Sequence, residues 1–572
     1  MFLEKAKSRQ FWDSVRTNPK YQPIIDELLQ EYQLVAHGEI KDISYDAFMH
    51  YHRTGERTLF ERQYYMPRRQ RLNVCALLSL IYPENDAYFS NLMNTIWAIC
   101  NEYAWSLPNH NAKVSAHQYN VTHIDLFAAE TAQALSEIRF LLGDRMDDLM
   151  NDRIQKELDR RIIQPFVNTV YDWEDYQTNW AAVCGGGVGC TFLYERPDLF
   201  WQLKPRFDHA MESFLSSYKA DGVSREGVLY WQYGFGYFTC YAQHLYEVSK
   251  GAYNYFADEH VKAMAHFPEM TLLGHGEVVN FSDCGRKAKV GLGTLSILDQ
   301  HYGDILCHIP EEYYMIMDYL KRGRWQVAVR GVVYFDPERN YASPIKSGIY
   351  YKEDSAWFVK KSPAYCFAAK GGHNDEPHNH NDVGSFLLSC NGKQILADLG
   401  SGEYTKDYFW NRYAVFCTRS LGHNVPILDG QEQGAGETYA GTMTWNGDHL
   451  VIDMTHAYPK NRVLQAVRTF AFAEDAIVLK DTFSFTEPCG ITERLISLVK
   501  PELSHGQILV SAFAVCFDSN AWEASVTETT HKRYDSQEET VYLIDFVNKD
   551  PDAAEFTARI APAGKENACE NN

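Results

Sequence analysis

The spacing of apolar residues changes near residue 325, and this change divides the chain into two parts of different fold class. In the first part, apolar residues recur three and four positions apart, which predicts amphipathic helices. Such helices are expected at 86–105, 123–143, 205–222 and 311–323. Gly143 and Gly323 stand at positions typical of helix C-caps. Successive helical hairpins without a detectable repeat predict a ring or stack of helix pairs.

Two connectors rich in glycine and aromatic residues separate the predicted helices: NWAAVCGGGVG at 179–189 and REGVLYWQYGFGY at 225–237. The glycines of the first connector do not indicate a phosphate-binding loop, because no lysine with Ser or Thr follows at the required spacing and no clear strand precedes them. We expect these glycines to permit a close approach, either between helices or between the backbone and a sugar.

After residue 325, short apolar runs alternate with turns. The run at 383–400 is expected to fold back at Asn391-Gly392, a dipeptide typical of type I′ hairpin turns, and Asn446-Gly447 is expected to do the same. Many strands, frequent turns and no helical period predict an antiparallel sandwich. The expected organisation is a helical domain at 1–322, a sandwich domain at 323–561 and a disordered tail at 562–572.

The length and charge of the chain limit its class and its partners. At 572 residues the chain is too long for a single hydrophobic core, so two or more domains are expected. The formal net charge of −21 argues against nucleic acid as the main partner. An anionic substrate is still compatible with this charge, because Arg412 and Arg419 could line a local basic cleft. The run Arg68, Arg69 and Arg71 allows the same interpretation, although a solvated helix face is favoured for it.

Targeting signals are absent from the sequence as it stands. No run of about 18 apolar residues occurs, so no membrane partner is expected. The first residues lack the apolar region of a secretory signal, and the 13 cysteines are scattered without CxxC spacing. This pattern predicts a cytoplasmic protein with free thiols. A homo-oligomer is left open.

The densest group of chemically active side chains lies in GGHNDEPHNHNDVGSFLL, residues 371–388. His378 and His380 are two positions apart and would face the same side of an extended strand. The expected hairpin would return Asp398 towards His380, and His423 lies on a further segment. Imidazoles and a carboxylate from three segments make a candidate site for a divalent metal, most simply Zn²⁺. A polar histidine-rich loop without a metal is the alternative.

Three segments here, HNHNDVGSFLL, ILADLGSGEY and RSLGHNVPILDG, resemble the sandwich signature of the heparinase II/III-like polysaccharide lyases. That family includes glycosaminoglycan lyases and oligoalginate lyases. The resemblance extends over both halves of the chain and is strong across residues 371–430. It implies an α+β multidomain fold, with an incomplete (α/α) toroid followed by an antiparallel β-sandwich. It also implies cleavage of uronic-acid-containing glycans by β-elimination.

The resemblance implies roles for individual residues of the sandwich. His378, the first histidine of the HxH pair, matches the family's catalytic histidine. The family's metal ligands are matched by His380, Asp398 and His423. The metal there holds a loop of the sandwich and is regarded as structural. Zinc is the usual ion, and other divalent cations stay open.

In the helical half, TNWAAVCGGGVG resembles the family's cleft motif, in which Asn179 would hydrogen-bond the substrate carboxylate. Trp180 stands where several members carry a second catalytic histidine, and this departure puts acceptance of both uronate epimers in doubt. EGVLYWQYGFGY resembles the segment of the catalytic tyrosine. The number of residues between Asn179 and this segment favours Tyr233 as the catalytic tyrosine, and Tyr237 is the alternative.

Each of these residues also has an ordinary structural interpretation. Tyr233 would be a packing residue, and Asn179 a helix-cap or turn residue. Glu226 would either orient the tyrosine or be an exposed loop acid. Arg419 would either bind substrate or brace the metal loop. The candidates for substrate binding are Trp180, Glu226, Tyr237, Arg412 and Arg419.

These residue types suit the chemistry of β-elimination, which removes the C5 proton of a uronate and expels the oxygen at C4. The substrate carboxylate must be hydrogen-bonded so that charge can move onto it, and the amide of Asn179 can donate there. A base is needed at C5 and an acid at the leaving oxygen. We expect Tyr233 to be the acid and also a candidate base. His378 would be the partner base or would stabilise the carboxylate charge.

Three other functions compete with this one. A glycoside hydrolase on an (α/α) toroid would use two carboxylates, for which four acids of the helical half are available: Asp125, Glu130, Asp172 and Glu174. A non-catalytic glycan-binding protein would keep the fold without turnover. A metallohydrolase would use the histidine and aspartate ligands to activate water. For a lyase, the expected partner is an anionic uronate-containing glycan of the heparan, chondroitin or hyaluronan type, with alginate oligomers as the main alternative.

Overall fold

The computed structural model describes residues 4–36, 38–111, 121–318, 320–376, 378–405, 407–408, 411, 414–459 and 462–563. Two compact units divide the chain. The helical unit comprises Met1–Tyr218, Tyr230–Ala265 and Lys289–Ser343. The sheet unit comprises Lys219–Leu229, His266–Ala288 and Pro344–Asn572. Within the described residues, no helix has the length and apolar character that crossing a membrane requires.

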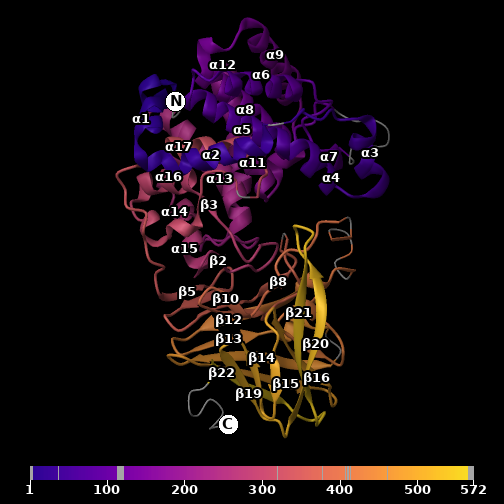
Figure 1. Ribbon diagram of the computed structural model, residues 1–572. Coiled ribbons are helices and arrows are strands. Elements are labelled where there is room, and N and C mark those ends of the chain that lie inside the picture. The colour runs from indigo at the N-terminus through magenta and orange to yellow at the C-terminus, as the bar shows by residue number, and fades with distance from the viewer. Residues whose placement is uncertain are drawn as a thin grey trace. The chain divides into compact units, whose positions relative to one another are not determined.

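The helical unit is built from helices along almost its whole length (Figure 1). They are α1 (Arg9–Thr17), α2 (Gln22–Val35), α3 (Tyr45–Thr54), α4 (Thr58–Phe60), α5 (Met66–Ile81), α6 (Asp86–Cys100), α7 (Pro108–Asn111), α8 (Leu126–Leu142), α9 (Asp148–Leu158), α10 (Gln164–Asn168), α11 (Asn179–Glu195), α12 (Pro197–Leu215), α13 (Val228–Val248), α14 (Glu259–Ala265), α16 (Leu292–Tyr302) and α17 (Trp325–Val333). Two short strands, β3 (Val290–Gly291) and β4 (Tyr314–Met315), pair in parallel.

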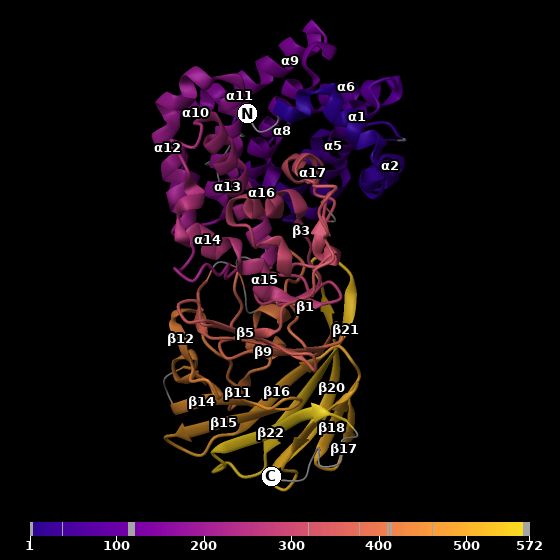
Figure 2. The same ribbon diagram turned by 90° about the vertical axis from the view of Figure 1, so that its left-hand side faces the viewer.

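The packing of these helices closes into a toroid. Helices α2 and α6 pack against α5, α8 packs against α11, and α11 packs against α12 (Figure 2). Helix α16 packs against α17, which in turn contacts α5 and α8. The last helix of the unit therefore returns to the early ones. This confirms the ring of helices that the sequence predicted.

Three sequence-based expectations for the helical unit are wrong. The two connectors at 179–189 and 225–237 lie largely in the long helices α11 and α13. Helix α11 is buried on nearly every side, so its apolar residues show no amphipathic period, and tertiary packing overrides the low helix propensity of glycine. The described residues of the segment 311–323 form no α-helix: a single 3-10 turn at Glu311–Tyr313 leads directly into β4. Gly323 accordingly caps no helix, whereas Gly143 does end α8.

The glycines of α11 do serve the close helix approach that the sequence suggested. A Cβ atom on Gly187 would lie 3.0 Å from the carbonyl oxygen of Ala129 in α8. On Gly189 it would lie 2.6 Å from the ring of Tyr241 in α13. Real Cβ atoms essentially never come as close as the second of these distances. Glycine at these positions therefore lets α11 lie directly against α8 and α13.

The sheet unit holds the antiparallel strands. They are β1 (Leu272–Gly274), β2 (Glu277–Val278), β5 (Gly348–Lys352), β6 (Trp357–Lys361), β7 (Cys366–Lys370), β8 (Gly372–Asn374), β9 (Phe386–Cys390), β10 (Lys393–Leu396), β11 (Pro426–Leu428), β12 (Gly436–Trp445), β13 (His449–Asp453), β14 (Val463–Phe472), β15 (Ile477–Phe485), β16 (Ile491–Ser497), β17 (Glu502–Ser504), β18 (Gln507–Val510), β19 (Phe513–Phe517), β20 (Trp522–Lys532), β21 (Glu538–Asn548) and β22 (Glu555–Pro562). A short helix, α15 (Phe267–Thr271), precedes β1.

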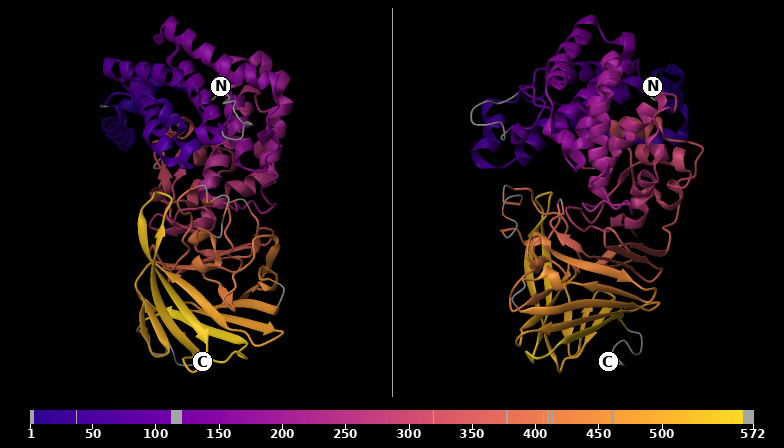
Figure 3. Two further views of the ribbon diagram at one scale, coloured as in Figure 1. Left: turned by 90° about the vertical axis from the view of Figure 1, so that its right-hand side faces the viewer. Right: turned by 180° about the vertical axis from the view of Figure 1, so that it is seen from behind.

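Three sheets of this unit enclose one apolar core. Their strand orders are β10-β9-β7-β6-β5, β11-β16-β21-β20 and β17-β18-β19-β22-β15-β14-β13-β12-β8. The core contains Phe386 from the first sheet, Leu495 from the second and Leu479 from the third, each fully buried. Figure 3 shows these strands, coloured orange to yellow, lying in layers. The predicted antiparallel sandwich is confirmed.

The two predicted hairpins differ in their turns. Asn391 and Gly392 join β9 to β10 and have φ values of 48° and 67°, which is the type I′ turn expected. Strands β12 and β13 also form a hairpin, but Asn446 is hydrogen-bonded to His449, so the central residues are Gly447 and Asp448. Among these two only Gly447 has a positive φ. The second turn therefore lies one residue later than predicted.

The predicted domain limits also need revision. Helix α17 follows residue 322 and packs in the helical unit, which extends to Ser343. Two segments from the first half of the chain belong instead to the sheet unit. Strand β22 includes Pro562, and most of the predicted tail, from residue 564, lies outside the described residues.

A buried ion cluster supports the loops of the sandwich. Arg468 of β14 donates to Asp481 of β15 at 2.6 Å and to Glu493 of β16 at 3.1 Å. It also donates to the carbonyl oxygens of Gly384 and Asn424 at 2.9 and 2.5 Å. All three charged side chains have no solvent exposure. Arg468 therefore ties two sheets to the loops on either side of the histidine-rich segment.

Candidate functional site

The histidine-rich loop between β8 and β9 converges with a second loop that the sequence did not single out. Nδ1 of His378 lies 2.7 Å from Oδ2 of Asp283, and Nε2 of His380 lies 3.2 Å from Oδ1 of the same carboxylate. His378 has a φ of 55°, a backbone conformation that non-glycine residues rarely adopt and that is often found at functional sites. The two histidines therefore share one buried carboxylate.

The position of Asp283 is fixed by its own segment. Asn280 donates from its amide to the carbonyl oxygen of Asp398 at 2.9 Å. Gly400 has a φ of 61°, and a Cβ atom there would lie 2.0 Å from the carbonyl oxygen of Cys284. Ser282 donates to the carbonyl oxygen of Arg225 at 2.8 Å. Three chain segments are thereby held together around the carboxylate of Asp283.

Two tyrosines complete the environment of Asp283. Tyr404 donates to Oδ2 at 2.9 Å, and its ring stacks with the ring of His378 at 6.3 Å between centroids. Tyr408 donates to Oδ1. Burial opposes ionisation of Asp283, but hydrogen bonds with His378 and His380 outweigh it and hold the pKa of the carboxyl below its ordinary value. Asp283 is therefore an anion that orients His378.

Glu226 is the second acid beside His378. Its Oε2 atom is shielded from solvent and has no hydrogen-bond partner among the described residues. Burial raises the pKa of Glu226 to about 7, with the charge of His378 acting in the opposite direction. The neighbouring Arg225 pairs with Glu376, which also lies 2.9 Å from Nε2 of His373. Glu226 is thus an enclosed carboxyl rather than an exposed loop acid.

The structure brings together the three predicted metal ligands. One ligand atom each from His380, Asp398 and His423 lies within 4.8 Å of the others, and all three side chains are fully buried. Nδ1 of His423 lies 3.2 Å from Oδ2 of Asp398, while its Nε2 lies 2.8 Å from the carbonyl oxygen of Cys417. Because that carbonyl accepts a hydrogen bond from Nε2–H, Nδ1 can serve as a ligand.

The chemistry of this cluster fits a divalent metal. Nδ1 of His380 is buried and has no hydrogen-bond partner among the described residues. Two imidazoles and one carboxylate are donors that Zn²⁺ accepts. Asp398 also accepts a hydrogen bond from the backbone N–H of Gly400 at 2.8 Å, which orients the carboxylate. An unsatisfied buried nitrogen on one of these histidines is compatible with a cation ligand.

In the helical unit, the start of α11 lies against α13 at Gly234, the residue that follows Tyr233. A Cβ atom on Gly234 would lie 3.1 Å from Cβ of Asn179. The side chain of Thr178 accepts from the backbone N–H of Trp180 and is the N-cap. Asn179 itself is therefore not the cap, which leaves its amide for another role.

Tyr233 lies in a charged environment. The guanidinium of Arg324 lies 3.6 Å from its ring centroid, and Arg324 in turn lies 3.6 Å from Glu130. The Tyr233 hydroxyl is buried without a hydrogen-bond partner that meets normal geometry among the described residues. Burial and the nearby Glu130 raise the pKa of Tyr233 well above its ordinary value, against the opposing charge of Arg324. The phenol therefore keeps its proton at neutral pH.

The remaining candidates of the helical unit have varied surroundings. Tyr237 is buried, with its ring 5.9 Å from that of Tyr233, and burial raises its pKa. Trp180 is half-buried and lies 4.8 Å from the ring of His110. Nδ1 of His110 lies 2.6 Å from Oδ2 of Asp125. A histidine–aspartate pair thus lies beside the tryptophan that replaces the family's histidine.

The acids available to a glycoside hydrolase are largely engaged in structural contacts. Asp125 caps α8 by accepting from the N–H of Ala128 at 2.8 Å and also accepts from Leu107. Glu174 pairs with Arg206. Glu130 lies beside Arg324, and Asp172 is exposed. These contacts give no pair of free carboxylates among the four acids.

The predicted basic residues that the structure describes are engaged in contacts within their own units. Arg68, Arg69 and Arg71 are buried in α5, so neither a basic cleft nor a solvated face is correct. Arg68 and Arg69 both pair with Glu102. Arg419 pairs with Glu432 and so braces the loop that precedes His423. Arg412 lies outside the described residues.

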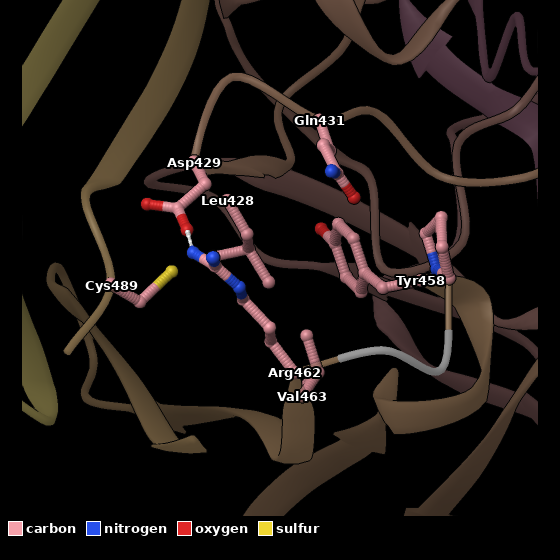
Figure 4. Close-up of a pocket in the computed structure, with 8 residues that line it drawn as sticks. Leu428, Asp429, Gln431, Tyr458, Arg462, Val463 and Cys489 are labelled. Atoms are coloured by element: carbon pink, nitrogen blue, oxygen red, sulfur yellow. Dashed lines mark hydrogen bonds and ion pairs between the residues drawn. The ribbon is translucent and has the colours of Figure 1, made fainter. Parts of the chain in front are cut away.

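One pocket of about 630 Å³ opens elsewhere in the sheet unit (Figure 4). Arg462 reaches across it to Asp429, and Tyr458 and Cys489 also line it. None of the candidate catalytic or metal-binding residues lines this pocket. It is therefore separate from the site around Asp283.

The residues missed by sequence reasoning are Asp283, Tyr404 and Tyr408. Asp283 stands alone in NFSDCG and carried no signal. Tyr404 belongs to the GSGEY segment that carries the family resemblance, so a functional role for it was open to prediction. Tyr408 lies just beyond that segment. Only the fold brings these three side chains to His378.

Comparisons with known proteins agree with this fold. Residues 353–488 match the family model described as Heparinase II/III-like, C-terminal. No curated protein matches the sequence. Among solved structures, one of heparinase III is 12% identical, with a TM-score of 0.62, and the match covers 86% of this chain and 76% of that one.

Two further solved structures share the fold. Heparan sulfate lyase HepC from Pedobacter heparinus is 13% identical, with a TM-score of 0.59, and 98% of this chain and 87% of that one are covered. The Streptomyces coelicolor A3 chondroitin AC lyase, solved in complex with chondroitin sulphate, is 10% identical, with a TM-score of 0.55 and coverage of 98% and 83%. The chain thus has the toroid-and-sandwich architecture of these lyases. The predicted resemblance to the heparinase II/III-like family is confirmed by the match of residues 353–488 to its C-terminal model and by the shared fold.

Proposed function

We propose that this protein is a polysaccharide lyase that cleaves uronic-acid-containing glycans by β-elimination. The observation that carries the proposal is the pairing of His378 with the buried anion Asp283 at 2.7 Å, beside the enclosed carboxyl of Glu226. This arrangement equips a histidine to take a proton. The shared fold with heparan and chondroitin lyases supports it.

The proposed base is His378. Asp283 accepts from Nδ1, which selects the tautomer whose Nε2 carries a lone pair in the neutral imidazole. In the reaction this nitrogen takes the C5 proton of the uronate. The C–H electron pair becomes the C4=C5 double bond as the C4–O bond breaks. Asp283 stabilises the imidazolium that results.

The proposed acid is Tyr233. Because the raised pKa keeps its phenol protonated, Tyr233 suits donation to the leaving oxygen better than abstraction of the C5 proton. Asn179 would donate its amide N–H to the substrate carboxylate, where charge develops as the proton leaves. His378 is therefore preferred to Tyr233 as the base.

The metal has a structural part in this proposal. His380, Asp398 and His423 would hold a divalent cation, Zn²⁺ being the first choice. When bound, that cation would supply positive charge that fixes three loops of the sandwich. His380 also contacts Asp283, so the ligand set would position the carboxylate that orients His378.

Glycosaminoglycan fragments are the proposed substrates, because the named neighbours include heparan sulfate and chondroitin lyases. Alginate oligomers are the main alternative. Both classes contain uronates and would give the same unsaturated product end. A panel of heparan, chondroitin, hyaluronan and alginate oligosaccharides separates them by relative kcat/KM.

The test follows the ultraviolet absorbance of the new double bond, which is conjugated with the uronate carboxylate. Wild-type protein should generate this absorbance on at least one glycan, and His378→Ala should lose it. His449→Ala is the matched control, because His449 is an exposed histidine of the same unit. Tyr233→Phe should bind substrate but turn it over poorly. Cleavage without the absorbance would refute the proposal and favour hydrolysis.

A further inference from the structure

A second group of metal-ligating side chains lies in the core of the helical unit, apart from the proposed lyase chemistry. Cys190 comes from α11, and Cys240 and His244 come from α13. All three are buried, and their ligand atoms lie within 4.8 Å of one another. Cys240 and His244 are four positions apart and therefore project from the same face of their helix.

The glycines of α11 explain why the two helices come close enough to form this group. A Cβ atom on Gly186 would lie 3.1 Å from the carbonyl oxygen of Tyr237, and on Gly189 it would lie 2.6 Å from the ring of Tyr241. Both contacted residues belong to α13, on either side of Cys240. Cys190 follows Gly189 directly and is carried to within 4.0 Å of Cys240.

The three ligand atoms form a nearly equilateral triangle. The two sulfur atoms are 4.0 Å apart, and Nδ1 of His244 lies 3.7 Å from Sγ of Cys190 and 3.9 Å from Sγ of Cys240. An ion about 2.3 Å from each sulfur and about 2.0–2.1 Å from the nitrogen, with all angles near 120°, requires separations of about 4.0 and about 3.8 Å. The observed triangle matches these values without movement.

We propose that Cys190, Cys240 and His244 bind one thiophilic metal ion in the core of the helical unit. Two thiolates and one imidazole suit Cu⁺ or Zn²⁺. Three donors in a plane favour Cu⁺, because structural Zn²⁺ sites almost always use four. The ion would tie α11 to α13 and so stabilise the toroid.

The surroundings supply the support that such ligands need. The Tyr194 hydroxyl lies 2.9 Å from Nε2 of His244 and fixes the ring, which leaves Nδ1 directed at the sulfurs. Gln133 donates to Sγ of Cys240 at 3.1 Å, a contact that stabilises a thiolate.

One existing contact would change on binding. Nδ1 of His244 now lies 3.0 Å from the carbonyl oxygen of Cys240. That carbonyl is positioned four residues before His244 in a helix, so the backbone N–H of His244 continues to satisfy it. Loss of the Nδ1 contact therefore leaves no buried carbonyl without a donor.

The test reconstitutes the reduced full chain with Co²⁺, because cobalt bound to thiolate gives an intense near-ultraviolet charge-transfer band. The His380, Asp398 and His423 cluster contains no sulfur and gives no such band, so the two sites are distinguished. Wild-type protein should show the band at one equivalent. Cys190→Ala and Cys240→Ala should lose it. Cys184→Ala should keep it, since Cys184 is a buried thiol of α11 outside the cluster.

Competition then identifies the ion. Cu⁺ or Zn²⁺ should displace Co²⁺ and abolish the band. The ion that does so at the lower free concentration is the one that the site prefers. The proposal is overturned if the reduced wild-type protein gives no band, if the band survives in Cys190→Ala, or if Cys190 and Cys240 form a disulfide that excludes metal. Should a variant fail to fold, X-ray absorption on the wild-type cobalt protein decides: two sulfur neighbours at about 2.3 Å support the site, and only nitrogen or oxygen neighbours overturn it.

Discussion

Nδ1 of His378 lies 2.7 Å from the carboxylate of Asp283, two residues that are 95 positions apart in the sequence. The same carboxylate also contacts His380, a candidate metal ligand, and accepts from Tyr404. Asp283 therefore links the proposed base to the proposed metal centre. The predictions below follow from this link and from the charges buried around it.

Replacing Asp283 with Asn should lower kcat by about two to four orders of magnitude, because the carboxylate no longer selects the His378 tautomer or stabilises the imidazolium. KM should change much less, since Asp283 is not proposed to touch substrate. Steady-state kinetics with one uronate oligosaccharide measure both. Asp375→Asn is the control, because Asp375 is an exposed acid of the loop that carries His378. A kcat equal to that of wild type would remove Asp283 from the mechanism.

Glu226 should make stability depend on pH. Burial raises its pKa from 4.5 to about 7 in the folded protein, so the folded state binds the proton more tightly than the unfolded state does. Its stabilising contribution is fully present below about pH 4.5 and is lost as the pH rises to about 7. Glu226→Gln should remove this dependence. Between pH 5 and pH 8, the melting temperature should therefore fall less in the variant than in the wild-type protein. Parallel curves of melting temperature against pH for the two proteins would contradict the assignment.

Arg468→Met should destabilise the sheet unit by about 3–5 kcal/mol, because it leaves the buried carboxylate of Asp481 without a positive partner and removes a hydrogen-bond donor from the buried Glu493. Denaturant unfolding measures the difference. Lys480→Met is the control: Lys480 pairs with Glu555 at the surface, and its loss should cost less than about 1 kcal/mol. Equal effects of the two substitutions would show that the buried cluster has no special role.

Chelation should lower the melting temperature, because the metal at His380, Asp398 and His423 is proposed to be structural. His423→Ala should have a low melting temperature already and should respond less to chelator. Metal affinity should weaken as the pH falls, because a protonated imidazole has no lone pair to offer a metal. Loss of activity on chelation with an unchanged melting temperature would instead favour a metal-activated water and the metallohydrolase alternative.

Much of the fold could be predicted because its signals are local. The segments 86–105 and 123–143 carry a helical period that α6 and α8 use, and Asn391-Gly392 specifies its own hairpin. Helix α11 could not be recognised, because it is apolar on all sides and its glycines argue against a helix. Its helical state depends on close packing against α8 and α13, which is a tertiary effect.

The candidate site was predictable only in part for a related reason. Four of the site residues lie within one stretch of the sequence, so the sequence alone indicates that they could form a group. They are His378, His380, Asp398 and His423. Asp283 lies far upstream in a segment without a motif, and only the contacts of Asn280, Ser282 and Gly400 place it beside His378. The orienting partner of a catalytic residue is thus set by topology rather than by local pattern.

Product masses test the central claim most directly. A defined uronate tetrasaccharide is incubated with the wild-type protein, and both product fragments are weighed by mass spectrometry. Elimination adds no water, so the account predicts two fragments whose masses sum to that of the substrate, one of them carrying an unsaturated uronate. Fragments whose masses sum to that of the substrate plus one water would show hydrolysis and contradict the account.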